Sequence, residues 1–140
     1  MRHFCVAEQR DRDARLLIFA QMKKVLIISP YSLGSGNRTT VERIASHLIG
    51  LVEVTIIDAV IGQITEEPDF VILLHAYKAG KKYRELGLSA NFGLIYGGTD
   101  LNQMTNETWK IIDELTKEAK FRICFSEDFY RMCMMNWVWL

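Results

Sequence analysis

Short apolar stretches alternate along the chain with segments whose apolar residues recur every three or four positions. Helical spacing places Val41, Ile44, Ala45 and Leu48 on one face of a segment. A second helix is predicted over 105–119, with Thr105 as its cap. Five stretches have the length and composition of buried strands: 25–29, 52–58, 69–75, 92–96 and 121–125.

This alternation predicts an α/β domain with a mostly parallel sheet and helices on both faces. We expect a Rossmann-like sheet with strand order 3-2-1-4-5, the strands being numbered along the chain. The segment 76–86 carries several Lys and Arg residues and is expected to form an exposed helix or turn. In a parallel sheet of this kind, ligands bind at the carboxyl ends of the strands.

The length of 140 residues fits one domain. We place its core in residues 22–140 and treat residues 1–21 as an extension outside it. A net charge of zero argues against a nucleic-acid-binding surface. Three cysteines without paired spacing favour a reduced, cytoplasmic chain, and no apolar run is long enough to span a bilayer. No His, Cys and carboxylate triplet has metal-ligand spacing, so we expect no metal.

The loop after the first strand is the strongest candidate for ligand binding. Gly34, Gly36 and Asn37 lie between that strand and the following helix, where free N–H groups and the helix dipole favour a phosphate. Asp58 lies about 20 residues further on, as in a dinucleotide fingerprint, but the third glycine of that motif is absent. A tight turn without any ligand remains an alternative.

Further polar residues follow the other strands at the same predicted edge. His75 ends the third strand, where it is either a hydrogen-bonded structural residue or a group that exchanges protons. Gly97, Gly98, Thr99 and Asp100 follow the fourth strand, as either a ligand-binding loop or a glycine-rich turn capped by Asp100. Glu127 follows the fifth strand.

Several of these segments together resemble a known family. They are 32–48, 74–80, 93–102 and 125–127. The most specific pieces are Gly36-Asn37 leading into Arg-Ile-Ala-Ser-His-Leu at 43–48, and Gly-Leu-Ile-Tyr-Gly-Gly-Thr-Asp-Leu-Asn at 93–102. They are similar to the N-terminal half of the glycosyltransferase 1 domain-containing protein 1 family, whose members are glycosyltransferase-like proteins of GT-B type. The resemblance covers roughly residues 23–137.

The resemblance implies retaining transfer of a sugar from a nucleotide-sugar donor to an acceptor, without a metal or other cofactor. A GT-B enzyme closes two Rossmann-like domains over its substrate. This chain would supply a truncated N-terminal, acceptor-side domain, and a C-terminal domain would cover the active edge. The roles implied are donor phosphate binding for Gly34, Gly36 and Asn37, catalysis for His75 and Asp100, and sugar or acceptor contact for the rest: Gly97, Gly98, Thr99 and Glu127.

Because one of two domains is missing from this pattern, we expect no sugar transfer by the chain alone. Two other functions stay open on the sequence. One is a small Rossmann-type dinucleotide-binding protein, which would bind NAD. The other is a non-catalytic interaction product that pairs through its apolar C-terminal end, residues 137–140.

Overall fold

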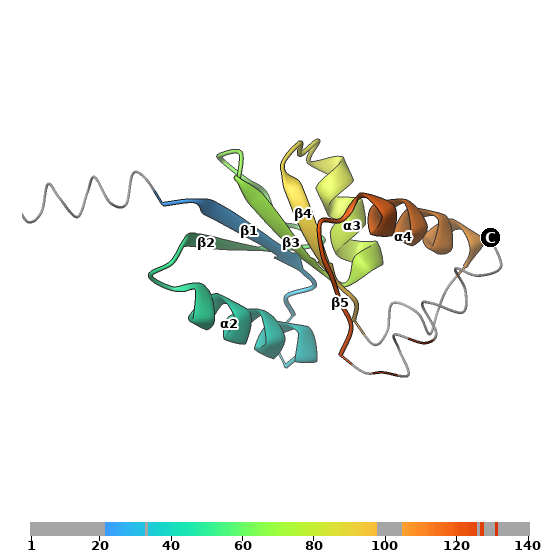
Figure 1. Cartoon of the computed structure of the whole chain (residues 1–140), viewed down its shortest axis with the longest axis horizontal. Coiled ribbons are helices and arrows are strands. Elements are labelled where there is room, and N and C mark those ends of the chain that lie inside the picture. The colour runs from blue at the N-terminus through green and yellow to red at the C-terminus, as the bar shows by residue number, and fades with distance from the viewer. Residues whose placement is uncertain (1–21, 33, 98–104, 126, 128–130, 132–140) are drawn as a thin grey trace, which may run out of the picture.

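The structure is a computed structural model that describes residues 22–32, 34–97, 105–125, 127 and 131. Helices and strands follow one another along the chain, with two strands in direct succession after the first described helix (Figure 1). The elements are β1 (Lys24–Ser29), α2 (Gly36–Leu48), β2 (Glu53–Asp58), β3 (Phe70–Leu74), α3 (Ala76–Glu85), β4 (Asn91–Ile95), α4 (Asn106–Glu118) and β5 (Arg122–Ile123).

All strand pairs are parallel, which confirms the predicted α/β class with a Rossmann-like parallel sheet. The observed order is β2-β1-β3-β4-β5, so the predicted order 3-2-1-4-5 is wrong. β3 pairs with the free side of β1, with Val25 opposite Phe70 and Ile28 opposite Leu73. It does not lie outside β2.

The burial of the two strands explains this order. Residues Val71 to Leu74 of β3 are all buried, as expected for a strand with neighbours on both sides and helices on both faces. β2 instead alternates, because Glu53 and Thr55 are exposed while Val54 and Ile56 are half-buried. Such alternation is typical of a strand at the sheet edge, where one face meets water.

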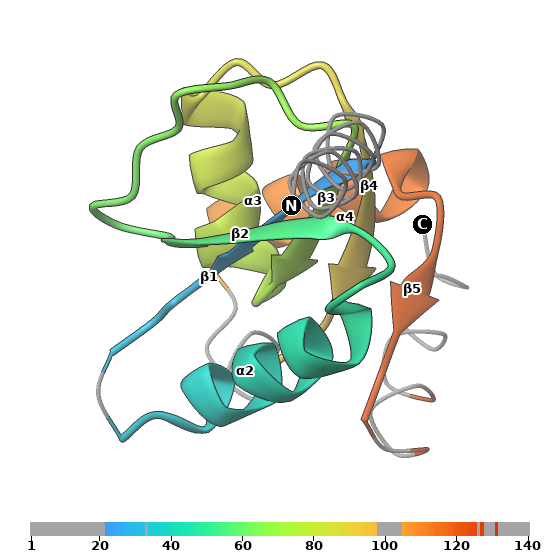
Figure 2. The same cartoon turned by 90° about the vertical axis from the view of Figure 1, so that its left-hand side faces the viewer.

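Helices cover both faces of the sheet, as predicted. Figure 2 shows α2 on one side of the sheet and α3 with α4 on the other. α2 contacts β1 and β2, and its Val41 is fully buried against Ile27 and Ile72. On the opposite face, α3 and α4 pack over a larger cluster that includes Leu73 and Leu94.

The prediction that 76–86 is exposed is wrong in part. α3 is a helix, but it buries one face that includes Ala79, Lys82 and Tyr83. Gly80 permits this close packing, since a Cβ there would lie 2.1 Å from Leu115 Cδ1 of α4. The helix predicted over 105–119 is confirmed as α4, and Thr105 caps it. Among the described residues, no helix is both long and apolar enough to cross a membrane.

Candidate functional site

The sheet order creates a switch point between β1 and β3. The chain leaves β1 through α2 toward β2, and it leaves β3 through α3 toward β4, so the two connections diverge. Because α2 and α3 also lie on opposite faces, their N-terminal ends lie on either side of the carboxyl ends of β1 and β3 (Figure 2). This is the position at which open α/β sheets bind their ligands.

The loop between β1 and α2 brings two glycines to this switch point. Gly34 has a φ of +75°, a conformation that favours glycine. Gly36 begins α2 with an ordinary φ, and no described atom lies within 4 Å of a Cβ built on it. Neither packing nor backbone geometry therefore requires glycine at position 36, and the space beside it is open.

The N-terminal end of α2 has backbone N–H groups that pair with no acceptor among the described residues. Ser35 Oγ accepts from the N–H of Arg38 at 3.2 Å, and the Ser35 carbonyl accepts from Thr39. Within the described residues, the N–H groups of Gly36 and Asn37 have no recorded acceptor, as is usual for a first helical turn. The first turn contains no acidic residue, so nothing in it opposes an anion.

Three side chains, those of Tyr31, Arg38 and Glu42, form a cluster that joins this loop to α2. The Tyr31 hydroxyl and Arg38 Nε both donate to Glu42 Oε1 at 2.9 Å. The Arg38 guanidinium carbon lies 4.9 Å from the centre of the Tyr31 ring. The bond from Arg38, then that from Tyr31, lowers the pKa of Glu42. Sequence reasoning missed this cluster, although the spacing of Arg38 and Glu42 by four residues is a recognisable helical ion pair.

The Asp58 carboxylate accepts hydrogen bonds from three backbone N–H groups. One carboxylate oxygen accepts from the N–H of Tyr31 at 2.9 Å, and the other accepts from Val60 and Ile61 at 2.7 and 3.1 Å. Burial opposes ionisation, but these three donors and the Lys82 ammonium outweigh it and lower the Asp58 pKa. Asp58 thus fixes the loops after β1 and β2, a structural use that the dinucleotide alternative did not anticipate.

His75 lies directly after β3, at the switch point, and is buried, with 6% of its surface exposed. Among the described non-glycine residues, it is the one with positive φ, at 77°. Its Nδ1 accepts from the N–H of Lys78 at 3.3 Å and caps α3. Because Nδ1 uses its lone pair, the neutral ring carries its proton on Nε2 and is a donor there.

Some of the remaining predicted site residues lie among the residues that the structure describes, and others do not. Gly97 is buried and follows β4 at the same edge of the sheet as His75. Glu127 is exposed, and its Oε1 accepts from Arg131 at 2.7 Å. Gly98, Thr99 and Asp100 lie outside the described residues.

Lys82 is a buried charge that the sequence analysis did not single out. Its Nζ donates to the carbonyl of Val60 at 3.2 Å and lies 3.9 Å from Glu85. It joins α3 to the turn after β2 that Asp58 also holds. Its position three residues after Ala79 on the buried face was the available signal.

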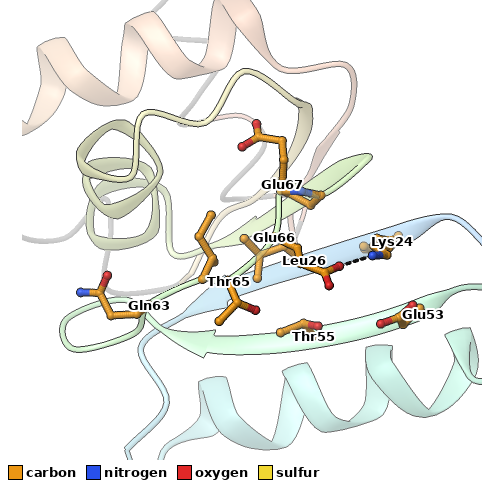
Figure 3. A pocket seen from close by; sticks show the side chains of 11 residues that line it. Lys24, Leu26, Glu53, Thr55, Gln63, Thr65, Glu66 and Glu67 are labelled. Carbon is orange, nitrogen blue, oxygen red and sulfur yellow. Dashed lines mark hydrogen bonds and ion pairs between the residues drawn. The ribbon is translucent and has the colours of Figure 1, made fainter.

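A pocket of about 210 Å³ opens at the other end of the sheet (Figure 3). The first halves of β1 and β2 and the loop before β3 line it, and an ion pair between Lys24 and Glu66 stands within it. None of the predicted site residues lines this pocket. Among the described residues, no cluster of three or more His, Cys, Asp or Glu side chains has the arrangement of a metal site.

No model of a known protein family matches the chain. The chain is 26% identical over 127 aligned residues to a Xenopus tropicalis protein named Glycosyltransferase 1 domain-containing protein 1. The alignment covers 81% of this chain and 36% of the relative, so the chain spans about a third of that protein's length. The resemblance indicated by the sequence motifs is confirmed, since the chain is similar over most of its length to a protein of that name.

Proposed function

We propose that this chain is the donor-phosphate and acceptor-side part of a glycosyltransferase-like protein that uses a nucleotide-sugar. In this proposal, residues 22–140 form part of the N-terminal domain of a GT-B enzyme, and residues 1–21 lie outside its core. A second domain closes over the switch-point edge, and transfer proceeds with retention of configuration. No metal or other cofactor takes part.

The observation that carries the proposal is the open glycine at the start of α2. Gly36 is not required by packing or by φ, and its N–H and that of Asn37 face the switch point without a described acceptor. A diphosphate there would accept from these groups and gain from the helix dipole. The homology to a glycosyltransferase-like protein supports a nucleotide-sugar as the source of that diphosphate.

His75 is the second element of the proposed site. It follows the strand adjacent to β1, so its backbone lies at the same edge as the glycine loop. We assign His75 to the transferred sugar as a catalytic group, and the bond from the Lys78 N–H to its Nδ1 fixes the orientation of the ring. Gly97, Gly98, Thr99, Asp100 and Glu127 remain our candidates for the sugar and acceptor side, with Asp100 as a catalytic group.

The dinucleotide alternative is less well supported. In that function an acidic residue after the second strand accepts from ribose hydroxyls. Here the Asp58 carboxylate accepts three backbone N–H groups, which leaves it little capacity for a ribose. We therefore expect NAD to bind more weakly than UDP- or GDP-sugars.

Ligand-observed NMR with UDP-sugars, GDP-sugars and NAD tests the proposal on the 140-residue chain. We expect nucleotide-sugar affinity on the order of millimolar, because one domain supplies few contacts. No nucleotide should be released by these 140 residues, because the proposal places the other half of the site on a second domain. Tighter binding of NAD than of either nucleotide-sugar would support the dinucleotide alternative and contradict the proposal.

A matched pair of substitutions locates the phosphate. Asn37→Asp adds a negative charge to the first turn of α2, and Asn106→Asp makes the same change in the first turn of α4. Each new carboxylate interacts favourably with the dipole of its helix and stabilises that helix by about 0.3–1 kcal/mol. Neither variant should therefore unfold the domain. Only Asn37→Asp should abolish nucleotide-sugar binding. Equal effects of the two variants would show that the phosphate does not lie at α2.

A further inference from the structure

β2 is an outer strand of the sheet. It stands at one end of the strand order and, among the described strands, pairs with β1 alone. In Figure 2 the molecule is seen from this edge, with β2 in front of β1. The opposite outer strand, β5, has two residues, whereas β2 has six. β2 is therefore the longer edge of the described sheet.

Every second residue of β2 directs its backbone groups away from the sheet. The N–H of Glu53 donates to the carbonyl of Lys23 at 2.9 Å, so Glu53 and, two residues further on, Thr55 direct their N–H and C=O groups toward β1. The corresponding groups of Val54 and Ile56 point outward, and no described residue pairs with them. Such an edge is a template on which another strand can pair.

The most exposed apolar side chains lie in the chain directly before and after β2. Among the described residues, the four large apolar side chains with the greatest exposure are Ile49, Leu51, Val60 and Ile61, at 76%, 72%, 70% and 80%. The first two precede β2, and the last two follow it. Exposed apolar side chains at both ends of an unpaired edge mark a surface that a partner covers.

A second copy of β2 matches this edge in antiparallel orientation. A two-fold axis at Thr55 sets Val54 of one copy opposite Ile56 of the other. Because both residues carry outward backbone groups, they exchange two hydrogen bonds, and the symmetry repeats this pair on the other side of the axis. The apolar side chains that precede β2 in one copy then meet those that follow β2 in the other.

The charges of β2 also permit this pairing. Glu53, which is exposed, lies opposite Ile57 of the second copy in this register. The two Glu53 residues are then about 14 Å apart along the strands, which is more than the Debye length of about 8 Å at physiological ionic strength. The Asp58 carboxylate accepts from N–H groups of its own chain. No like charges of β2 therefore stand directly opposite each other.

We propose that the chain forms a two-fold homodimer in which the β2 strands pair antiparallel about Thr55 and join the two sheets into one. The pairing satisfies the outward backbone groups of both edges and removes exposed apolar side chains from water. It uses the β2 edge and not the switch point between β1 and β3.

Disulfide trapping tests the register of this dimer. In the 140-residue chain with its three cysteines changed to Ser, Thr55→Cys and Glu53→Cys each introduce one thiol at an exposed position of β2. The two copies of residue 55 form a non-hydrogen-bonded pair, whose Cα separation of about 4.5 Å suits a disulfide, whereas the copies of residue 53 are too far apart. Under mild oxidation, a disulfide-linked dimer should be the main product of Thr55→Cys and a minor product of Glu53→Cys, measured by non-reducing electrophoresis. Equal trapping of the two variants, or trapping of neither, would overturn the proposal.

Charges placed on the axis give a second test that needs no oxidation. Sedimentation equilibrium of the unaltered chain should show a dimer with a Kd on the order of 10–100 μM, because the interface lies at the small end of specific ones. Thr55→Lys and Thr55→Glu each set two like charges directly opposite each other and should weaken the association about fivefold. An equal mixture of the two variants should restore it, because unlike charges then meet. An unaltered chain that stays monomeric at millimolar concentration, or variants that dimerise as well as the unaltered chain, would overturn the proposal.

Discussion

The backbone N–H of Tyr31 donates to the carboxylate of Asp58 at 2.9 Å. This bond joins the first residues of the loop after β1 to the last residue of β2. Asp58 also accepts from the turn that follows it, so a single carboxylate fixes both connections at this end of the sheet. The glycine loop of the proposed phosphate site begins three residues after Tyr31.

Replacing Asp58 by Asn should destabilise the domain. The amide has one acceptor oxygen, so its NH₂ group would face a backbone N–H that the carboxylate now satisfies. We expect a loss of about 1–3 kcal/mol in the free energy of unfolding, the usual cost of leaving a buried hydrogen-bonding group without its partner. Urea denaturation measures it, and a variant as stable as the wild type would contradict the assigned role.

The same carboxylate should make stability depend on pH. The pKa of Asp58 is lower in the folded chain than its ordinary value, so the native state binds fewer protons than the unfolded state. Its stabilising contribution is complete above about pH 4, near the unfolded pKa, and declines as the pH falls toward the folded value. Between pH 5 and pH 3, Asp58→Asn should therefore lose less stability than the wild type. Parallel curves for the two proteins would show that Asp58 does not contribute.

Substitutions at His75 should separate its backbone role from its imidazole. Positive φ at a residue other than glycine costs of order 1–3 kcal/mol, and the cap of α3 contributes about 1 kcal/mol. His75→Ala keeps the unfavourable φ and loses the cap, so we expect a loss of about 1–2 kcal/mol. His75→Asn tolerates positive φ and offers a capping oxygen, and it should be near the wild type. The order of urea midpoints measures this, and His75→Ala as stable as His75→Asn would contradict it.

Gly80 should tolerate no side chain. Alanine there gains about 1 kcal/mol of helix propensity but overlaps the fully buried Leu115, at a cost of about 1–3 kcal/mol. We expect Gly80→Ala to lower the thermal midpoint, and Gly80→Ala with Leu115→Ala to lose less than the sum of the single changes. Gly36→Ala is the matched control, because its Cβ would meet open space. A destabilisation by Gly36→Ala equal to that of Gly80→Ala would contradict this packing argument.

The fold class could be predicted from the sequence, because the continuous apolar runs of buried strands differ clearly from the spacing of three or four residues in amphipathic helices. The strand order was also encoded: β3 has no polar interruption, whereas Glu53 and Thr55 interrupt β2 and mark it as an edge strand. The prediction failed because it did not use this difference. In the observed order, the switch point lies between β1 and β3, and His75 lies at it because it directly follows β3.

Other features of the site depend on contacts between distant segments. The carboxylate of Asp58 has the same sequence signature whether it binds ribose or backbone N–H groups, and only the position of Tyr31 distinguishes the two. Likewise, the burial of Lys82 requires the turn at Val60 to lie over α3. The positive φ of His75 has no sequence signal, because histidine is not a residue that turns require.

Amide NMR of the 140-residue chain, titrated with a UDP-sugar and a GDP-sugar, tests the central claim most directly. The account predicts that the largest shifts belong to the N–H groups of Gly36 and Asn37, followed by His75 and Gly97, with saturation on the order of millimolar ligand. The shifts should disappear in Asn37→Asp and persist in Asn106→Asp. Shifts centred on Lys24 and Glu66 in the pocket at the other end of the sheet, or no shifts at all, would contradict the account.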